Sequence, residues 1–206
     1  DIELHCKKVL KAKYDYGLAS LKPINTNNLT IDLNKDVSNM RKIIAENALT
    51  VLKKTDDAFF PLPAKKDAAE KEIVYVSIGS NIDNDFAKRM RTDYNADVVN
   101  INYKQDDYEI TTIVAQLKKK YKQVVIGVHN ISRFQANNFG ISKNAVALVT
   151  QLQQKTKAIT FVFGNVYAVK NWCDAKNLVA FYEDDSIVQN TAVDLLQGKI
   201  AAKGKL

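Results

Sequence analysis

Four short apolar runs, separated by long connections, constrain the fold of this 206-residue chain more than any other feature. Nearly all their residues are apolar or β-branched, without the polar alternation of a strand that has one face in water. Such strands need helices on both faces, and connections of this length favour right-handed crossovers over hairpins. The runs are Ile73–Gly79, Val124–Val128, Ile159–Phe163 and Leu178–Tyr182. We therefore predict an α/β three-layer sandwich with a mostly parallel sheet of five or six strands, in which 124–128 and 159–163 are central.

Amphipathic helices are expected between these strands. The apolar residues at positions 110, 113, 114, 117 and 121 follow the spacing of one helix face. Ser142 is placed to cap a second helix, and Asp185 or Ser186 to start a last helix that stops at Gly198.

The first part of the chain contains two further predicted helices. One runs from Ile2 to about Tyr16, where Gly17 supplies a left-handed cap, and the other starts at a Ser38 cap. A polar, extended passage separates them. Each helix has a single apolar stripe, and two helices alone bury too little surface to be stable. We expect both to pack on one flank of the α/β domain.

The charge of the chain does not indicate a nucleic-acid partner. Lys and Arg outnumber Asp and Glu by 30 to 23, but the basic residues are spread along the chain. The denser groups, 7–13 and 118–122, fall on or just after amphipathic helices, where a solvated face explains them. No apolar run reaches the roughly 18 residues of a membrane span, and no signal peptide is recognisable.

The cysteines do not indicate a metal site. Cys6 and Cys173 are the two cysteines of the chain, and neither has a second Cys or His at ligand spacing. Structural zinc needs about four such ligands, so we expect neither a metal nor another cofactor. We expect buried free thiols; whether the two pair depends on whether they meet in the fold.

Two landmarks near opposite ends of the chain carry a family resemblance. The first is Ala48–Lys54 followed by Phe59–Leu62. The second consists of four short pieces, which occur in the order Gly164–Lys170, Leu178–Asp184, Leu195–Gly198 and Gly204–Leu206. Together they resemble the C-terminal domain of glycoside hydrolase family 3, with the linker that leads into it from the family's barrel domain.

The resemblance implies a fragment of a longer bacterial enzyme. Residues 1–70 would be a helical linker from a barrel domain, and residues 71–206 the C-terminal α/β sandwich. The parent would hydrolyse terminal β-linked sugars, N-acetyl-β-glucosaminides among them, in the periplasm, the cell envelope or the medium. In this family the nucleophile aspartate belongs to a barrel motif that this chain lacks. The chain alone is therefore expected to be noncatalytic, with the barrel as its partner and carbohydrate reaching it through the parent.

The carboxyl ends of the parallel strands are where a ligand is expected. The loops there are 79–84, 103–107, 129–140, 164–172 and 183–185. The loop 129–140 is long, polar and aromatic, so it either packs against a partner domain or contacts sugar directly. Its candidate residues are His129, Asn130, Arg133, Phe134, Asn137 and Asn138.

No catalytic residue is predicted. In some branches of the family a nearby loop supplies an acid/base glutamate, but 129–140 contains no acid. This departure favours the N-acetylhexosaminidase branch, whose acid/base lies in the barrel. Glycoside cleavage needs two placed carboxyl groups, whereas Glu183, Asp184 and Asp185 lie at a helix start. There, acids cap the helix and oppose its dipole.

An alternative from another class is a stand-alone flavodoxin-like module that binds a ligand or a protein. A flavodoxin needs a Ser/Thr-rich phosphate loop after the first strand, and Gly79-Ser80-Asn81 is short for that purpose. A receiver-like module needs paired acids at the same place. Asp83 and Asp85 lie further along, at the predicted helix start.

Overall fold

The computed structural model describes residues 1–55, 60–65, 71–104 and 109–205, and it confirms the predicted fold class. The strands are β1 (Thr50–Lys54), β2 (Ile73–Ile78), β3 (Asp97–Ile101), β4 (Gln123–Val128), β5 (Ala158–Phe163) and β6 (Asn177–Phe181). They form one six-stranded sheet in the order β1-β6-β5-β4-β2-β3. The last five strands in that order are parallel, with β4 and β5 in the centre as predicted. The edge strand β1 runs antiparallel to β6, so the sheet is mixed.

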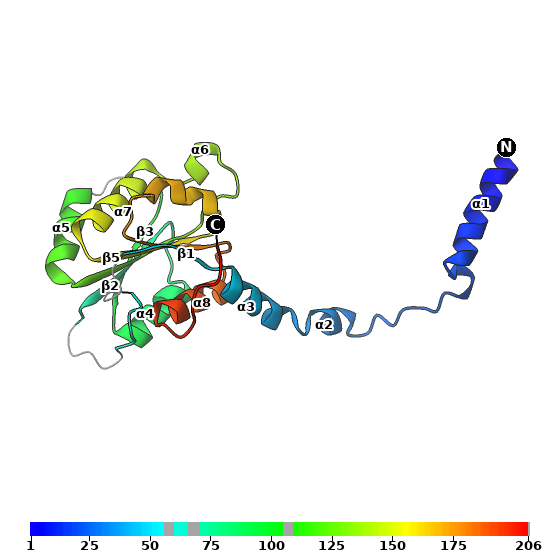
Figure 1. The fold of residues 1–206 in the computed structure, drawn as a ribbon, viewed down its shortest axis with the longest axis horizontal. Helices are drawn as coiled ribbons and strands as arrows, with labels where there is room; N and C mark the ends of the chain where they lie inside the picture. Colours follow the sequence, from blue (N-terminus) through cyan, green and yellow to red (C-terminus); the bar gives the residue numbers. More distant parts are fainter. Residues whose placement is uncertain (56–59, 66–70, 105–108, 206) are drawn as a thin grey trace. The chain divides into compact units, whose positions relative to one another are not determined.

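Helices cover both faces of the sheet. Figure 1 shows α4 and α8 on one side and α5 and α7 on the other. These helices are α4 (Asp85–Tyr94), α5 (Ile110–Lys120), α7 (Lys143–Lys155) and α8 (Ser186–Leu196); the short helices α6 (Ala136–Phe139) and η2 (Val166–Trp172) lie in loops. Alternate residues of each central strand enter two separate cores: Tyr75 and Phe161 lie in the core under α4 and α8, and Val76 and Ile126 in the core under α5 and α7.

The predicted start and stop signals of α7 and α8 are confirmed. Ser142 caps α7, its hydroxyl accepting a hydrogen bond from the Ala145 amide at 3.2 Å. Asp185 caps α8 through bonds from the amides of Ile187 and Val188. Gly198 has the left-handed φ of 74° that ends this helix.

The chain divides into two compact units, residues 1–37 and 38–206. The first unit contains α1 (Ile2–Asp15), η1 (Leu18–Ser20) and α2 (Leu29–Asn34). The helix α1 confirms the first predicted helix, and α2 was not predicted. Within its own unit, the side chains of α1 are exposed, so nothing in residues 1–37 covers its apolar stripe. The predicted packing of this helix on a flank of the α/β domain stays a prediction.

The second predicted helix is α3 (Val37–Ala48), which starts at Val37, one residue before the expected cap. It belongs to the second unit, and Ala45 and Leu49 are buried in the core under α4 and α8. The strand β1 that follows was not predicted. This strand lies within residues 1–70, which the family resemblance assigns to a linker from a barrel domain. The division into a linker and an α/β domain refers to a longer polypeptide, and it stays a prediction.

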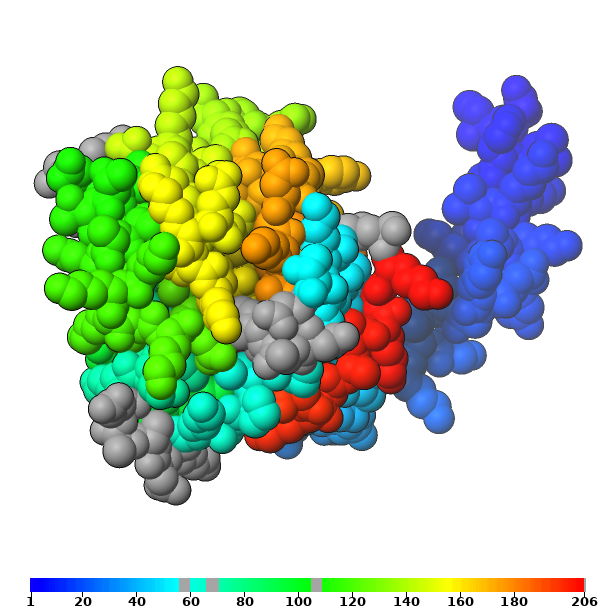
Figure 2. Space-filling view, turned by 60° about the vertical axis from the view of Figure 1, so that its left-hand side comes forward, coloured from blue at the N-terminus to red at the C-terminus, as the bar shows by residue number. Residues whose placement is uncertain are grey.

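The two sequence landmarks meet in the fold. Gly204 donates its amide to the Leu49 carbonyl at 3.0 Å, and a Cβ on Gly204 would lie 2.3 Å from the Ala48 carbonyl oxygen. Glycine is therefore required for this approach. Figure 2 shows the C-terminal residues, in red, beside the β1 region, in cyan. Of the landmark residues, Phe59 and Leu206 lie outside the described residues.

The cysteine prediction was wrong on burial. Cys6 and Cys173 are both free, as expected, but both are exposed. Within the described residues, no helix is long and apolar enough to cross a membrane.

Candidate functional site

A buried polar cluster lies at the carboxyl ends of the central strands, with His129 at its centre. His129 follows β4 directly and is 1% exposed. Its Nδ1 lies 2.8 Å from the Asp184 carboxylate, and its Nε2 accepts from the Asn84 amide at 3.1 Å. Because Nε2 accepts, Nδ1 carries the proton and donates to Asp184. The Tyr75 hydroxyl also lies 2.6 Å from Nε2.

Asp184 is the hydrogen-bond acceptor of this cluster. Besides the bond from His129, the Asp184 carboxylate accepts a hydrogen bond from the backbone amide of Asn130 at 2.9 Å and one from the side-chain amide of Gln189 at 2.8 Å. Burial raises the pKa of Asp184, but the hydrogen bonds outweigh burial and leave this pKa below the ordinary value. The group is therefore an ionised carboxylate at neutral pH, and both its oxygens are engaged.

This arrangement corrects the interpretation of the three acids. Asp185 caps α8 as predicted, whereas Asp184 binds His129 and the Asn130 backbone amide in the loop after β4, as well as the Gln189 side chain of α8. Glu183 is exposed. Sequence reasoning missed the link between His129 and Asp184, although both follow buried strands and so belong to the same sheet edge. The ring of Phe163, on β5 between them, stacks on His129 at 4.5 Å.

The structure divides the six candidate residues of the loop 129–140 into two groups. His129 belongs to the buried cluster, and the exposed Asn130 borders it, donating its side-chain amide to the Gly79 carbonyl at 2.7 Å. Arg133, Phe134 and Asn137 are exposed and Asn138 is partly exposed; all four lie away from His129 along the loop. The predicted role of these residues at a partner or a sugar stays a prediction.

The outer half of this loop has a strained backbone. Asn137, Asn138 and Phe139 are consecutive residues with φ of 51°, 53° and 60°. Asn tolerates this left-handed region, whereas an aromatic residue rarely adopts it. The buried Phe139 side chain and the bond from the Ser132 amide to the Phe139 carbonyl, at 2.9 Å, hold the turn in place. Phe134, in the same loop, has 71% of its surface exposed.

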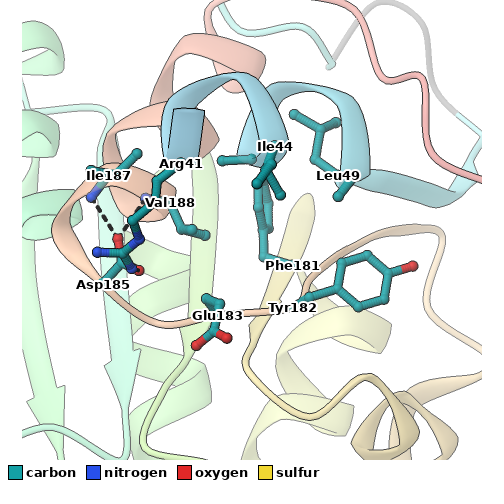
Figure 3. A pocket seen from close by; sticks show the side chains of 11 residues that line it. Arg41, Ile44, Leu49, Phe181, Tyr182, Glu183, Asp185, Ile187 and Val188 are labelled. Atoms are coloured by element: carbon teal, nitrogen blue, oxygen red, sulfur yellow. Dashed lines mark hydrogen bonds and ion pairs between the residues drawn. The ribbon is translucent and has the colours of Figure 1, made fainter. Parts of the chain in front are cut away.

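Several hollows lie near these residues. One of about 980 Å³ borders Asn137 and Asn138, and two others border the polar cluster and the end of β6. A cleft of about 510 Å³ lies between the loops after β2 and β4 and is lined by Gly79, Ser80, Asn81, His129, Asn130 and Gln189, among others. An apolar groove of about 230 Å³ lies between α3 and the end of β6. Figure 3 shows this groove, with Ile44, Leu49 and Phe181 on its walls and the Arg41–Asp185 ion pair at one side.

The hydrogen-bond partners of His129 and of the two aspartates describe what this cluster can do. None of the hydrogen bonds to His129 in the described part of the chain comes from a serine or cysteine that could act as a nucleophile. Asp184 is enclosed by its donors and Asp185 is engaged in capping. Across residues 1–55, 60–65, 71–104 and 109–205, no group of three or more His, Cys, Asp or Glu side chains could hold a metal ion.

Comparisons with known proteins connect this fold to glycosidases. No protein-family model matches the sequence, and no curated protein matches it. Among solved structures, it is similar to a fungal multi-domain GH3 β-N-acetylglucosaminidase, with 17% identity, a TM-score of 0.63 and coverage of 90% of this chain and 20% of that one.

A family 3 β-N-acetylglucosaminidase from Paenibacillus sp. FPU-7 is also similar, with 16% identity, a TM-score of 0.61 and coverage of 97% and 38%. The β-glucoside phosphorylase BglX has 14% identity, a TM-score of 0.61 and coverage of 83% and 31%. The chain thus has the fold of one part of such enzymes, and it spans between a fifth and two fifths of their lengths.

Proposed function

We propose that this chain is the noncatalytic C-terminal domain of a glycoside hydrolase family 3 enzyme that removes terminal β-linked sugars, N-acetyl-β-glucosaminides among them. The observation that carries the proposal is the fold similarity, which covers most of this chain but a minor part of each neighbour. The hydrogen bond between Gly204 and Leu49 supports the proposal. It joins the two sequence landmarks in one structural unit, so both landmarks belong to the same contact in the fold.

The partner in this proposal is the barrel domain of the same polypeptide. Apolar surface supports this part of the proposal: within the unit 1–37, Ile2, Leu10 and Tyr14 of α1 are 89%, 58% and 74% exposed. The groove in Figure 3 is likewise apolar. Exposed apolar surface of this kind marks an interaction site, and the longer polypeptide would cover it. We place the parent in the periplasm, the cell envelope or the medium of a bacterium.

The loop 129–140 is the part of this domain that we propose borders the barrel's cleft. Its exposed Phe134 ring is suited to stack on a sugar, and Arg133 and Asn137 offer hydrogen-bond donors. The anchored inner half of the loop supports this role, since a fixed base presents these side chains in one position.

Expression of the longer polypeptide tests the proposal. It should carry a barrel upstream of Asp1 and hydrolyse aryl N-acetyl-β-glucosaminide or aryl β-glucoside. Phe134→Ala should then raise KM by about two- to tenfold with kcat unchanged, because stacking binds ground state and transition state alike. Gln154→Ala, an exposed change on α7, is the matched control. An upstream sequence without a barrel, or a parent inactive on both substrates, would refute the assignment.

A further inference from the structure

The acidic residues of this chain are unevenly distributed, although its basic residues are spread along it. Between Glu109 and Asp174 the sequence contains nine Lys and Arg residues and neither Asp nor Glu. The 23 acids of the chain are confined to its other parts, where 21 basic residues accompany them. The stretch without acids forms α5, α7 and the central strands β4 and β5. The excess positive charge of the chain therefore belongs to these elements.

The fold gathers lysines of this stretch at the amino-terminal edge of the sheet. The helix α5 leads from β3 to β4, and α7 leads from β4 to β5. Because these strands are parallel, each helix returns the chain to the edge where the next strand starts. Figure 2 shows α5, in green, beside α7, in yellow. At their ends the Val124 amide donates to the Lys157 carbonyl at 2.9 Å, which joins the starts of β4 and β5.

We call this group of exposed side chains the lysine edge, and it consists of Lys118, Lys119, Lys120, Lys122, Lys155 and Lys157. Two of the six pair with acids, Lys120 with Asp97 at 3.0 Å and Lys122 with Glu72. The other four form no ion pair within the described residues. A lysine in the last turn of a helix opposes the helix dipole. This effect explains a basic residue on each helix but does not explain the absence of acids from 110–173.

The composition of the lysine edge favours a surface of dispersed anionic groups over a nucleic acid. The lysine edge contains no Arg, the side chain that pairs bidentately with phosphates and bases. Within the described residues, no large apolar side chain of α5 or α7 is exposed, and Tyr121 is bonded to Asp97. Rings for stacking on bases are therefore not offered here. Lysines are flexible point charges, and clusters of about four to eight of them attract anionic lipid headgroups.

We propose that the lysine edge binds the headgroup surface of an anionic membrane. Because α5 and α7 expose no large apolar side chain in their described residues, the attachment is electrostatic and reversible. The lysine edge lies at the end of β4 opposite to His129, so attachment leaves the carboxyl-terminal loops of the sheet free. The proposal rests on the placement of charges alone, and it is independent of the glycosidase assignment.

Cosedimentation of the chain 1–206 with lipid vesicles tests the proposal. Vesicles of equal parts phosphatidylcholine and phosphatidylglycerol should bind the chain at about 0.1 M salt and release it at about 1 M, because the Debye length falls from about 10 Å to about 3 Å. Vesicles of phosphatidylcholine alone should not bind it. Equal binding to both kinds of vesicle, no binding to the anionic ones, or tighter binding to duplex DNA would overturn the proposal.

Two sets of substitutions locate the binding surface. The edge variant carries Lys118→Gln, Lys119→Gln, Lys155→Gln and Lys157→Gln. It should bind anionic vesicles at least about a hundredfold more weakly, since each lysine near such a surface contributes about fivefold. The matched control removes the same number of charges from α1, and it should retain vesicle binding; it carries Lys7→Gln, Lys8→Gln, Lys11→Gln and Lys13→Gln. Binding that the control loses and the edge variant keeps would refute the lysine edge.

A third variant separates charge from folding. Arg at the same four positions of the lysine edge keeps the charges and should bind anionic vesicles like the wild type. Thermal unfolding checks that the edge variant is folded, which is expected because Gln and Lys have similar helix propensities. If the edge variant does not fold, the pair Lys118→Gln and Lys119→Gln replaces it, with an expected loss of about 25-fold. Wild-type affinity in the folded variant would also overturn the proposal.

Discussion

At the scale of single residues, Asp184 is the side chain on which the polar cluster depends. Asp184→Ala should lower the free energy of unfolding by about 2–4 kcal/mol, because it leaves His129, Gln189 and the Asn130 amide without their acceptor in a buried place. Urea unfolding at neutral pH measures the loss. Glu183→Ala, next to it but exposed, should change stability by less than about 0.5 kcal/mol. Equal losses in the two variants would contradict this account of Asp184.

The sequence contains part of the information about this cluster. Its pattern places His129 and Asp184 at the ends of buried strands, and hence at one edge of the sheet. It does not show that they touch, because they lie 55 residues apart and their strands are not neighbours. The contact depends on Phe163 of the intervening strand, on which the His129 ring stacks. Such a side-chain arrangement has no periodic signal in the sequence.

At the scale of elements, the strands that are buried on both faces were predictable and the edge strands were not. The continuous apolar runs of β2, β4, β5 and β6 need cover on both sides, which leaves few alternatives. The edge strand β1 is half-exposed, and its residues Thr50 to Lys54 continue a helical pattern without a break. Its pairing with β6 is a tertiary contact, and tertiary contacts override local propensity.

The other edge strand gives a pH prediction. Asp97 of β3 accepts from Lys71 at 2.6 Å and from the Tyr121 hydroxyl at 2.6 Å. These bonds, against the opposing effect of burial, hold the pKa of Asp97 far below its ordinary value. A folded pKa below the unfolded one stabilises the protein above a pH of about 4, and this stabilisation is lost as the pH falls through the folded pKa.

Asp97→Asn should therefore cost about 1 kcal/mol at neutral pH, a modest amount because the lysine partners are half-exposed. The difference between wild type and variant should shrink as the pH is lowered below about 4. Urea unfolding at several pH values measures it, with Asp174→Asn, an exposed acid, as the control. A difference that stays constant down to acid pH would show that the charge of Asp97 is irrelevant.

The contact of the C-terminal segment with β1 gives a second prediction at this scale. Gly204→Ala should destabilise the fold by about 1–3 kcal/mol, because its Cβ would collide with the Ala48 carbonyl and the Thr50 hydroxyl. Thermal unfolding measures the loss, and Lys205→Ala, an exposed neighbour, should have little effect. A Gly204→Ala variant as stable as wild type would mean that this segment does not hold β1.

At the scale of the whole molecule, the fold indicates the class of longer protein that this chain resembles, and the site indicates which of its side chains are already engaged. The fold is that of one part of much longer glycosidases, and at the polar edge of the sheet Asp184 and Asp185 are both engaged in hydrogen bonds. Sequence alone could predict the fold from the two landmarks. It could not show that one acid of the cluster 183–185 is enclosed by His129 and its neighbours.

The central claim is that this chain supports catalysis without performing it, and turnover by the isolated chain tests it most directly. Purified residues 1–206 are assayed with aryl N-acetyl-β-glucosaminide and aryl β-glucoside, beside the longer polypeptide. Without two placed catalytic groups, the chain should not exceed the buffer blank, while the parent hydrolyses at least one substrate. Turnover by the isolated chain well above the blank, abolished by Glu183→Gln, Asp184→Asn or Asp185→Asn, would place the active site in this domain and contradict the account.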